Sequence, residues 1–150
     1  MAGIISTVGK VASVNLSEKK GMRKTPVPEG RLKEGFGLEG DAHASGEWGR
    51  QVSLLQLESI GKMKAKGLDV SAGDFAENIT TEGIDLTGLK PGDKLRIGPA
   101  EVEITQIGKK CHSRCEIYRL AGDCIMPREG IFAKVLRGGR VKKGDPVTPL

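Results

Sequence analysis

The part of the sequence best suited to chemistry is a short basic segment that contains two cysteines. Cationic neighbours crowd Cys111, and positive charge close to a thiol lowers its pKa from the usual value of about 8.5, which increases the thiolate fraction at neutral pH. The thiolate is the form that attacks an electrophile, carries a persulfide or binds a soft metal. Cys111 is therefore the candidate catalytic residue. The segment is Lys109-Lys110-Cys111-His112-Ser113-Arg114-Cys115, and a third cysteine, Cys124, follows it.

The same segment allows two other interpretations. Soft ligands for zinc or an iron–sulfur centre are available from Cys111, Cys115, Cys124 and His112. Against a metal site, the adjacent Cys111 and His112 rarely bind one ion together, and the spacing of Cys111 and Cys115 departs from the common Cys-x2-Cys pair. In the other interpretation the cysteines are small buried side chains without a chemical role, which applies most to Cys124.

Three further polar residues are candidates for binding an anion or a cofactor. Arg50 has a planar guanidinium that matches a phosphate, although a surface ion pair explains an arginine equally well. Asn78 falls in a predicted strand, where asparagine is disfavoured, and it either orients a ligand or satisfies backbone groups at a bulge. His43 lies in a glycine-rich loop, as an acid–base or anion contact or as a solvated histidine. We expect Lys24, in a polar loop, to be a solvated charge.

The composition predicts a globular, β-rich domain and argues against nucleic acid as a partner. Of the 150 residues, 37% are hydrophobic and only 3% are aromatic, so the core must consist mainly of Val, Ile and Leu. The 22 glycines indicate many tight turns. The net charge of +5 is mild, and the chain has few aromatic rings on which single-stranded bases would stack.

The cysteine count and the apolar pattern predict a cytoplasmic location. Three cysteines are an odd number, and the start of the chain lacks the basic region of a secretory signal. No apolar run approaches the roughly 20 residues that a membrane-spanning helix needs. We therefore expect reduced cysteines in the cytoplasm and no membrane partner.

Short strands must position these candidate residues. β-Branched residues within 4–16 predict two strands, or one strand bent at Gly9. Residues 51–55 are typical of a buried strand, and residues 56–66 of an amphipathic helix that ends at Gly67. The prediction also contains loops at 17–30 and 35–50, strands at 75–81 and 146–148, a hairpin of residues 94–97 and 101–107, and a short helix at 128–136.

Many short strands with one clear helix favour a mainly β fold with minor α, either a barrel or a folded-over sheet. The length fits a single domain over residues 1–150.

Motifs along most of the chain resemble the MOSC family, which takes its name from the C-terminal domain of molybdenum cofactor sulfurase. Their order and spacing run from about residue 35 to the end of the chain. The resemblance rests on Gly40-Asp41-Ala42-His43, Arg50-Gln51-Val52-Ser53-Leu54-Leu55, Gly73-Asp74-Phe75-Ala76-Glu77-Asn78-Ile79-Thr80-Thr81, Gly83-Ile84-Asp85-Leu86, Gly92-Asp93-Lys94-Leu95-Arg96-Ile97-Gly98, the strand 101–106 with a cysteine after it, Gly130-Ile131-Phe132-Ala133-Lys134-Val135-Leu136 and Gly144-Asp145.

This resemblance implies a MOSC-type β-barrel, mixed and partly closed, with one or two short helices. It also implies a domain that binds the pterin–molybdenum cofactor (molybdopterin) and carries sulfane sulfur, with Cys111 as sulfur carrier or molybdenum ligand. Arg50, Asn78 and, more weakly, His43 are the implied cofactor-binding residues. The chain lacks the pyridoxal-phosphate domain of fused relatives. The implied sulfur donor is therefore a separate cysteine desulfurase, and the acceptor is the molybdenum cofactor or a molybdoenzyme.

Two other functions remain open at this point. With Cys111 as a thiolate ligand of molybdenum, the domain would be a molybdenum-cofactor-dependent reductase of N-hydroxylated compounds. Without enzymatic activity, it would be a small barrel that binds a metal or a partner.

Overall fold

The computed structural model describes most of the chain, in seven ranges. These are residues 8–18, 24–41, 44, 51–67, 69–75, 77–108 and 130–150. They contain the strands β1 (Gly9–Leu16), β2 (Thr25–Val27), β3 (Glu29–Lys33), β4 (Gly37–Leu38), β5 (Val52–Gln56), β6 (Ile79–Glu82), β7 (Lys94–Ile97), β8 (Ala100–Ile107), β9 (Ile131–Arg137), β10 (Gly139–Lys142) and β11 (Pro146–Pro149), the helix α1 (Leu57–Lys64) and the 3-10 turn η2 (Leu86–Gly88).

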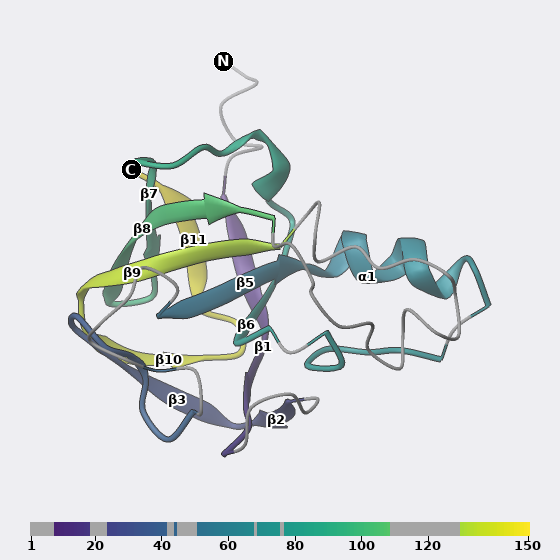
Figure 1. Ribbon diagram of the computed structural model, residues 1–150, viewed down its shortest axis with the longest axis horizontal. Helices are drawn as coiled ribbons and strands as arrows, with labels where there is room; N and C mark the ends of the chain where they lie inside the picture. The colour runs from purple at the N-terminus through teal and green to yellow at the C-terminus, as the bar shows by residue number, and fades with distance from the viewer. Residues whose placement is uncertain are drawn as a thin grey trace.

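Seven of the strands close into a barrel (Figure 1). Neighbouring strands follow the order β11-β7-β8-β9-β5-β6-β1, and β1 pairs again with β11, which completes the ring. β5 and β6 run parallel, whereas β5 and β9 run antiparallel, so the barrel is mixed. β2 extends the sheet beyond β1, and β10, β3 and β4 form a separate three-stranded sheet. The predicted mixed, mainly β barrel is confirmed, and the pairing of β1 with β11 closes it.

Aliphatic side chains fill the barrel interior. The register places Val14, Ile79, Leu54 and Ile131 in one row across β1, β6, β5 and β9. All four are completely buried and belong to one core cluster. Because side chains alternate along a strand, the residues next to this row face the outer side of the wall. The composition predicted such a core of Val, Ile and Leu.

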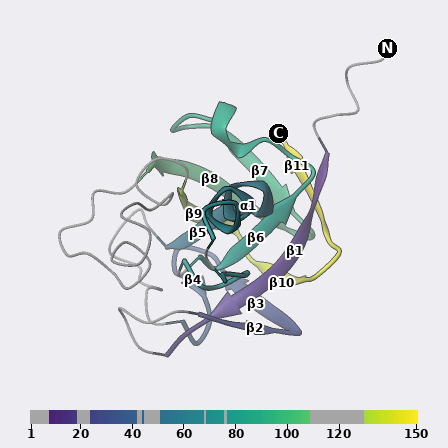
Figure 2. The same ribbon diagram turned by 90° about the vertical axis from the view of Figure 1, so that its right-hand side faces the viewer.

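The helix α1 continues directly from β5 and covers part of the outer wall. Ile60 and Met63 of α1 are completely buried and pack with Leu55, Phe75 and Phe132 in a second hydrophobic cluster. Figure 2 looks along α1 and shows the barrel strands arranged around it in projection. The helix is slightly shorter than predicted, and a turn ends at Gly67, whose φ of 91° suits glycine. No helix within the described ranges is both long and apolar enough to cross a membrane.

The prediction of a helix at 128–136 is wrong in its described part, because residues 131–137 form β9. Both faces of β9 are covered: Ile131 belongs to the barrel core, and Phe132 packs in the cluster that contains α1. A strand buried on both faces has a continuous apolar run, which periodicity alone does not separate from a buried helix.

The predicted loop at 17–30 also differs from the structure, since it contains β2 and the first residues of β3. The hairpin of β7 and β8 is confirmed, with Ile97 paired to Ala100. The last strand is confirmed as β11, and β6 begins only at Ile79, later than the predicted strand at 75–81.

Leu54→Ala tests the barrel interior. We expect the free energy of unfolding to fall by about 3 kcal/mol, because truncation of a completely buried leucine leaves a cavity. Leu150→Ala is the matched control at a side chain that is 58% exposed, and it should change stability by less than about 0.5 kcal/mol. Urea unfolding followed by circular dichroism measures both variants. Equal losses would contradict the position of Leu54.

Candidate functional site

A layer of buried polar side chains lies on the outer wall of the barrel, where β1, β5 and β6 meet. We call Asn15, Ser53, Glu77, Asn78 and Thr80 the polar layer, and none of them is more than 7% exposed. Burying polar groups costs free energy unless they find hydrogen-bond partners. The contacts of the polar layer supply such partners between strands that are distant in the sequence.

Asn78 joins the backbones of β5 and β1. Its Oδ1 accepts hydrogen bonds from the backbone N of Ser53 at 3.0 Å and from Ser53 Oγ at 3.3 Å. Its Nδ2 donates to the backbone oxygen of Asn15 at 3.3 Å. Its own carbonyl accepts from the backbone N of Asn15 at 2.7 Å. These contacts match the interpretation in which Asn78 satisfies backbone groups, and its role toward a cofactor stays a prediction.

Glu77 is a completely buried carboxyl within the polar layer. Its Oε2 accepts from Thr80 Oγ1 at 2.6 Å and from the backbone N of Gly73 at 2.9 Å. Among the described residues its Oε1 has no hydrogen-bond partner. Burial raises the pKa of Glu77, although the hydrogen bonds from Gly73 and Thr80 act in the opposite direction. The folded protein therefore holds a proton on Glu77 more tightly than the unfolded chain does.

Lys24 and Asp41 form a buried ion pair next to the polar layer. Lys24 Nζ lies 2.7 Å from Asp41 Oδ1, and both side chains are 0% exposed. Burial raises the pKa of Asp41, but the hydrogen bond and charge of Lys24 and the hydrogen bond from the backbone N of Ser17 outweigh it, so the pKa lies below its usual value. The prediction that Lys24 is solvated is wrong, because its side chain is buried and paired with Asp41. The sequence around Lys24 could not indicate this partner, which comes from a later turn of the chain.

Two glycines let backbone segments approach closely around this pair. Gly73 has a φ of 90°, and a Cβ there would overlap the carbonyl oxygen of Lys24. Gly37 has a φ of 128°, and a Cβ there would overlap the carbonyl oxygen of Gln51 and approach Ala44. Ala44 and Gln51 are the described residues on either side of the segment that contains Arg50. Both described ends of that segment therefore lie close to Gly37.

The described ends of the cysteine segment are Gly108, just after β8, and Gly130, just before β9. The backbone N of Gly108 donates to the carbonyl oxygen of Gly130 at 2.6 Å, so the two ends are side by side. The pairing of β8 with β9 shifts register between Ile104 and Gln106, and Thr105 Oγ1 donates to the carbonyl oxygen of Phe132 at 3.1 Å. Such bulges redirect a strand and are common beside functional sites. β8 ends at Ile107, so the strand that the sequence predicted shortly before Cys111 is confirmed.

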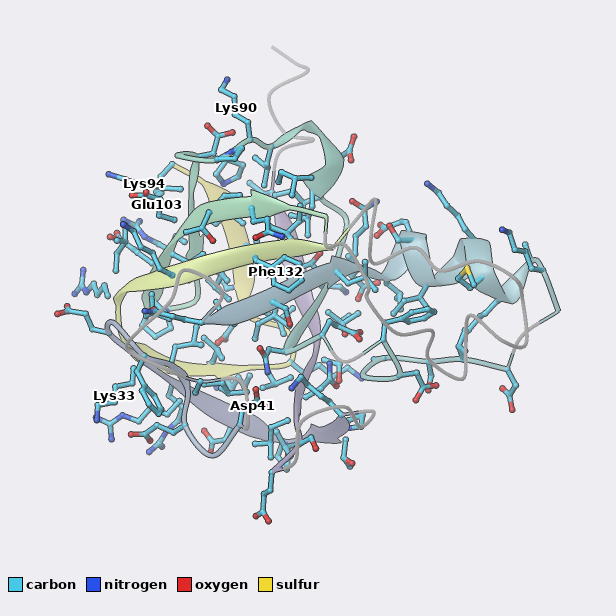
Figure 3. The ribbon with its side chains drawn as sticks, in the orientation of Figure 1. Lys33, Asp41, Lys90, Lys94, Glu103 and Phe132 are labelled. Carbon is cyan, nitrogen blue, oxygen red and sulfur yellow. The ribbon has the colours of Figure 1, made fainter. Side chains whose placement is uncertain are left out.

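The strand pairing connects the end of β8, from which the cysteine segment continues, to the polar layer on β5. Gln106 pairs with Phe132, and Phe132 pairs with Ser53 of the polar layer. Figure 3 shows Phe132 on β9 beside β5. Neighbouring strands are about 4.8 Å apart, so Gln106 and Ser53 are separated by roughly 10 Å. Phe132, which lies between them, is covered by the cluster that contains α1, so this part of the wall is buried.

The structure describes only one of the predicted site residues, Asn78. The other candidates, Arg50, His43, Cys111, His112, Cys115 and Cys124, lie outside the described residues, so their roles stay predictions. Among the described residues, no group of three or more His, Cys, Asp and Glu side chains could hold a metal. Sequence reasoning missed Lys24, Asp41 and Glu77. The Gly40-Asp41 motif, which formed part of the resemblance to the MOSC family, was the available signal for Asp41.

The described strands define a closed, mixed β-barrel domain with a buried polar layer on its outer wall. The MOSC domain family matches residues 41–148, and the chain belongs to this family, which is related to the molybdenum cofactor. β1 precedes the matched range, yet it closes the barrel.

Solved structures share this fold. The YuaD protein from Bacillus subtilis is 19% identical, with a TM-score of 0.77 and coverage of 94% of both chains. YiiM from Geobacillus stearothermophilus is 19% identical, with a TM-score of 0.68 over 95% of this chain and 75% of that chain. YiiM from Escherichia coli is 20% identical, with a TM-score of 0.68 over 96% of this chain and 70% of that chain. No curated protein matches the sequence.

Asn78→Ala tests the connection between β5 and β1. The variant leaves the backbone N of Ser53 buried without its acceptor, so we expect a loss of roughly 2–4 kcal/mol in the free energy of unfolding. Ser53→Ala removes only a hydroxyl and keeps the backbone hydrogen bonds, so its loss should be about 1 kcal/mol. Denaturant unfolding of both variants measures the difference. The reverse order would show that the Asn78 side chain is not the main link.

Glu77→Gln tests the pKa of the buried carboxyl. Because folding raises this pKa, stability falls as the pH rises from about 4.5 through the folded pKa, where the native state must release a proton that it binds more tightly. The amide of the variant does not titrate, so its stability should depend less on pH in this window. Urea unfolding at a series of pH values from about 4.5 to about 8 compares the two proteins. A stability difference that stays constant with pH would contradict the raised pKa.

Proposed function

We propose that this domain carries sulfane sulfur on Cys111 and binds the pterin–molybdenum cofactor that receives the sulfur. Two findings support the proposal. The chain belongs to the MOSC family. The cysteine segment leaves and rejoins the barrel at the bonded pair Gly108 and Gly130, on the same wall as the polar layer. The second of these is the observation that carries the proposal, because it anchors both ends of the segment that contains Cys111 at one edge of this barrel wall.

Loading of sulfur on Cys111 is a thiol exchange reaction. The Cys111 thiolate attacks the terminal sulfur of a persulfide on a separate cysteine desulfurase. A sulfur–sulfur bond forms at Cys111, the sulfur–sulfur bond of the donor breaks, and the donor cysteine leaves as a thiolate. The sulfane sulfur keeps its oxidation state, so the step needs no external oxidant or reductant. The basic neighbours Lys109, Lys110 and Arg114 favour the attacking thiolate.

Arg50 would hold the phosphate of the cofactor, with His43 as a weaker contact. The amide of Asn78 is already bonded to Ser53 and Asn15, so in this arrangement Asn78 supports the wall of the site. In this proposal the described residues act as a scaffold, and Arg50 and Cys111 belong to segments whose described ends this scaffold anchors. When bound, the cofactor supplies the molybdenum centre that accepts sulfur.

The partners in this proposal are a cysteine desulfurase as donor and the molybdenum cofactor or a molybdoenzyme as acceptor. We place the reaction in the cytoplasm, where reduced thiols persist.

Incubation with a cysteine desulfurase and cysteine tests the sulfur carrier. We expect one sulfur atom to be added to the purified protein, at Cys111, because basic residues flank this thiol in the sequence and favour its thiolate form. Cys111→Ser should abolish the gain, whereas Cys115→Ser and Cys124→Ser should keep it. Intact-protein and peptide mass spectrometry measure both the gain and its position.

The same preparation separates this proposal from its rivals. Equal sulfur loading of the Cys111→Ser protein would remove the carrier role from Cys111. Stoichiometric molybdenum without sulfur uptake would favour the reductase, and zinc or iron that is lost only when the three cysteines are replaced would favour a metal-binding barrel.

A further inference from the structure

A Gly-Asp turn before β7 is hydrogen-bonded both to itself and to the neighbouring strand β8. In this first turn, Lys90-Pro91-Gly92-Asp93, the backbone N of Lys90 donates to Asp93 Oδ2 at 3.0 Å. The backbone N of Asp93 donates back to the carbonyl oxygen of Lys90 at 3.0 Å. The backbone N of Gly92 donates to the carbonyl oxygen of Ile104 in β8, and the backbone N of Ile104 donates to that of Asp93, both at 2.8 Å. The turn is therefore fixed at one position of β8.

A second Gly-Asp turn, before β11, repeats this pattern on β1. In Lys142-Lys143-Gly144-Asp145, the backbone N of Lys142 donates to Asp145 Oδ2 at 3.0 Å, and the backbone N of Asp145 donates to the carbonyl oxygen of Lys142 at 3.1 Å. The backbone N of Gly144 donates to the carbonyl oxygen of Val11, and the backbone N of Val11 donates to that of Asp145, both at 2.8 Å. The φ of Gly144 is 95°, close to the 97° of the glycine in the first turn.

The two strands that receive these turns also share an irregularity. β8 pairs with β9 and shifts register between Ile104 and Gln106. β1 pairs with β6 and shifts register between Val11 and Ser13. In both strands the shift directly follows the residue that is bonded to the Gly-Asp turn. A turn alone does not require a bulge in its neighbour, so the bulge is a second, separate point of agreement.

The agreement extends around the whole ring. Ile131 of β9 and Ile79 of β6 both pair with Leu54 of β5. On the other side of the barrel, β7 and β11 pair antiparallel with each other (Figure 2), with Arg96 opposite Thr148 at the centre of their register. An approximate twofold axis through Leu54 and through this central pair therefore relates β7, β8 and β9 to β11, β1 and β6. β5 lies on the axis and belongs to neither half.

The halves differ where the ladders end beside β5. In one half the backbone N of Asn15 donates to the carbonyl oxygen of Asn78 at 2.7 Å, and the Asn78 side chain adds its cross-link. In the other half the backbone N of Gly108 donates to the carbonyl oxygen of Gly130 at 2.6 Å, and neither glycine has a side chain to add. The cysteine segment thus joins the wall at the counterpart of the position that Asn78 connects.

We infer that the barrel consists of two copies of one three-stranded unit, β7-β8-β9 and β11-β1-β6, each fixed by a Gly-Asp turn at the same strand position. The chain order conceals this repeat, because β8 follows β7 in a hairpin whereas β1 precedes β11 by most of the sequence. The pairing of β1 with β11 is short, so the second turn is the contact that holds β1 in the ring. No residue of the cysteine segment enters the inference, which is therefore independent of the proposed function.

The two turns differ at one position, which allows them to be exchanged. Pro91 is the second residue of the first turn, and Lys143 is its counterpart. A glycine with positive φ at the third position is typical of a type II turn, where proline is favoured at the second. The backbone N of Lys143 donates to no described residue, and Lys142 before it is the last residue of a strand, as a residue before proline should be.

We expect Lys143→Pro to lower the equilibrium constant of unfolding about two- to fivefold, because proline restricts the unfolded chain at a compatible position. Pro91→Lys should raise this constant by a similar factor, and the exchanged protein, with both changes, should return to the wild-type value. Lys142→Pro is the matched control. It removes the backbone donor to Asp145 Oδ2, so it should raise the constant by at least about tenfold. Urea unfolding followed by circular dichroism measures all four proteins.

Amide hydrogen exchange in the unmodified protein tests the strand position, which the turn variants do not. The amides of Val11 and Ile104 make the same hydrogen bond in the two units. We expect both to exchange only through global unfolding, with protection factors that agree within about threefold.

Either measurement can overturn the inference. A Lys143→Pro protein that is less stable than the wild type would show that the two turns are not equivalent. A Val11 amide that exchanges about a hundredfold faster than that of Ile104 would show that β1 is not held as β8 is. This second result would reduce the repeat to a shared turn, even if the proline variant were more stable.

Discussion

Hydrogen bonding of buried polar groups around Asn78 is the constraint on which the rest of the structure depends. β5 and β6 are the parallel neighbours in a mixed barrel, and β1 must join β6 to close the ring. Asn78 bonds to Ser53 at the start of β5 and to Asn15 at the end of β1, so one residue connects the three strands. A buried amide that lost these partners would cost the full desolvation of its donor and acceptors. The cross-link therefore favours one register of the barrel wall.

The same constraint extends to the segments that cover the wall. Thr80 links Glu77 to Asn15, and the Lys24–Asp41 pair joins the covering chain to the polar layer. The interior of the barrel, by contrast, is held by non-directional packing of Val, Ile and Leu. Apolar packing thus stabilises the closed ring, whereas the directional hydrogen bonds and the ion pair fix the positions of the segments that lie on the wall. His43 and Arg50, to which we assign cofactor binding in this MOSC domain, follow Asp41 in the sequence.

Local patterns in the sequence predicted much of the fold, but not the contacts between distant segments. The alternation in β7 and β8 and the apolar run of β5 were sufficient to predict those strands. β9 was predicted as a helix because both of its faces are buried, which removes the alternation. Lys24 was predicted to be solvated, since its partner Asp41 is identified only by the folded chain. Asn78 was a candidate cofactor-binding residue from the resemblance and was expected within a strand, whereas β6 begins just after it, at Ile79, and its side chain forms a structural connection of the wall.

Amide hydrogen exchange measured by NMR tests the central role of this cross-link most directly. The backbone amides of Ser53, Asn78 and Asn15 all donate within the network around Asn78. We predict that these three amides exchange only through global unfolding, with an opening free energy equal to that from urea unfolding. The amide of Ser71, which bonds to Asp74 at an exposed turn, should exchange through local fluctuations. Exchange of the three network amides at the rate of Ser71, well below the global free energy, would contradict the account.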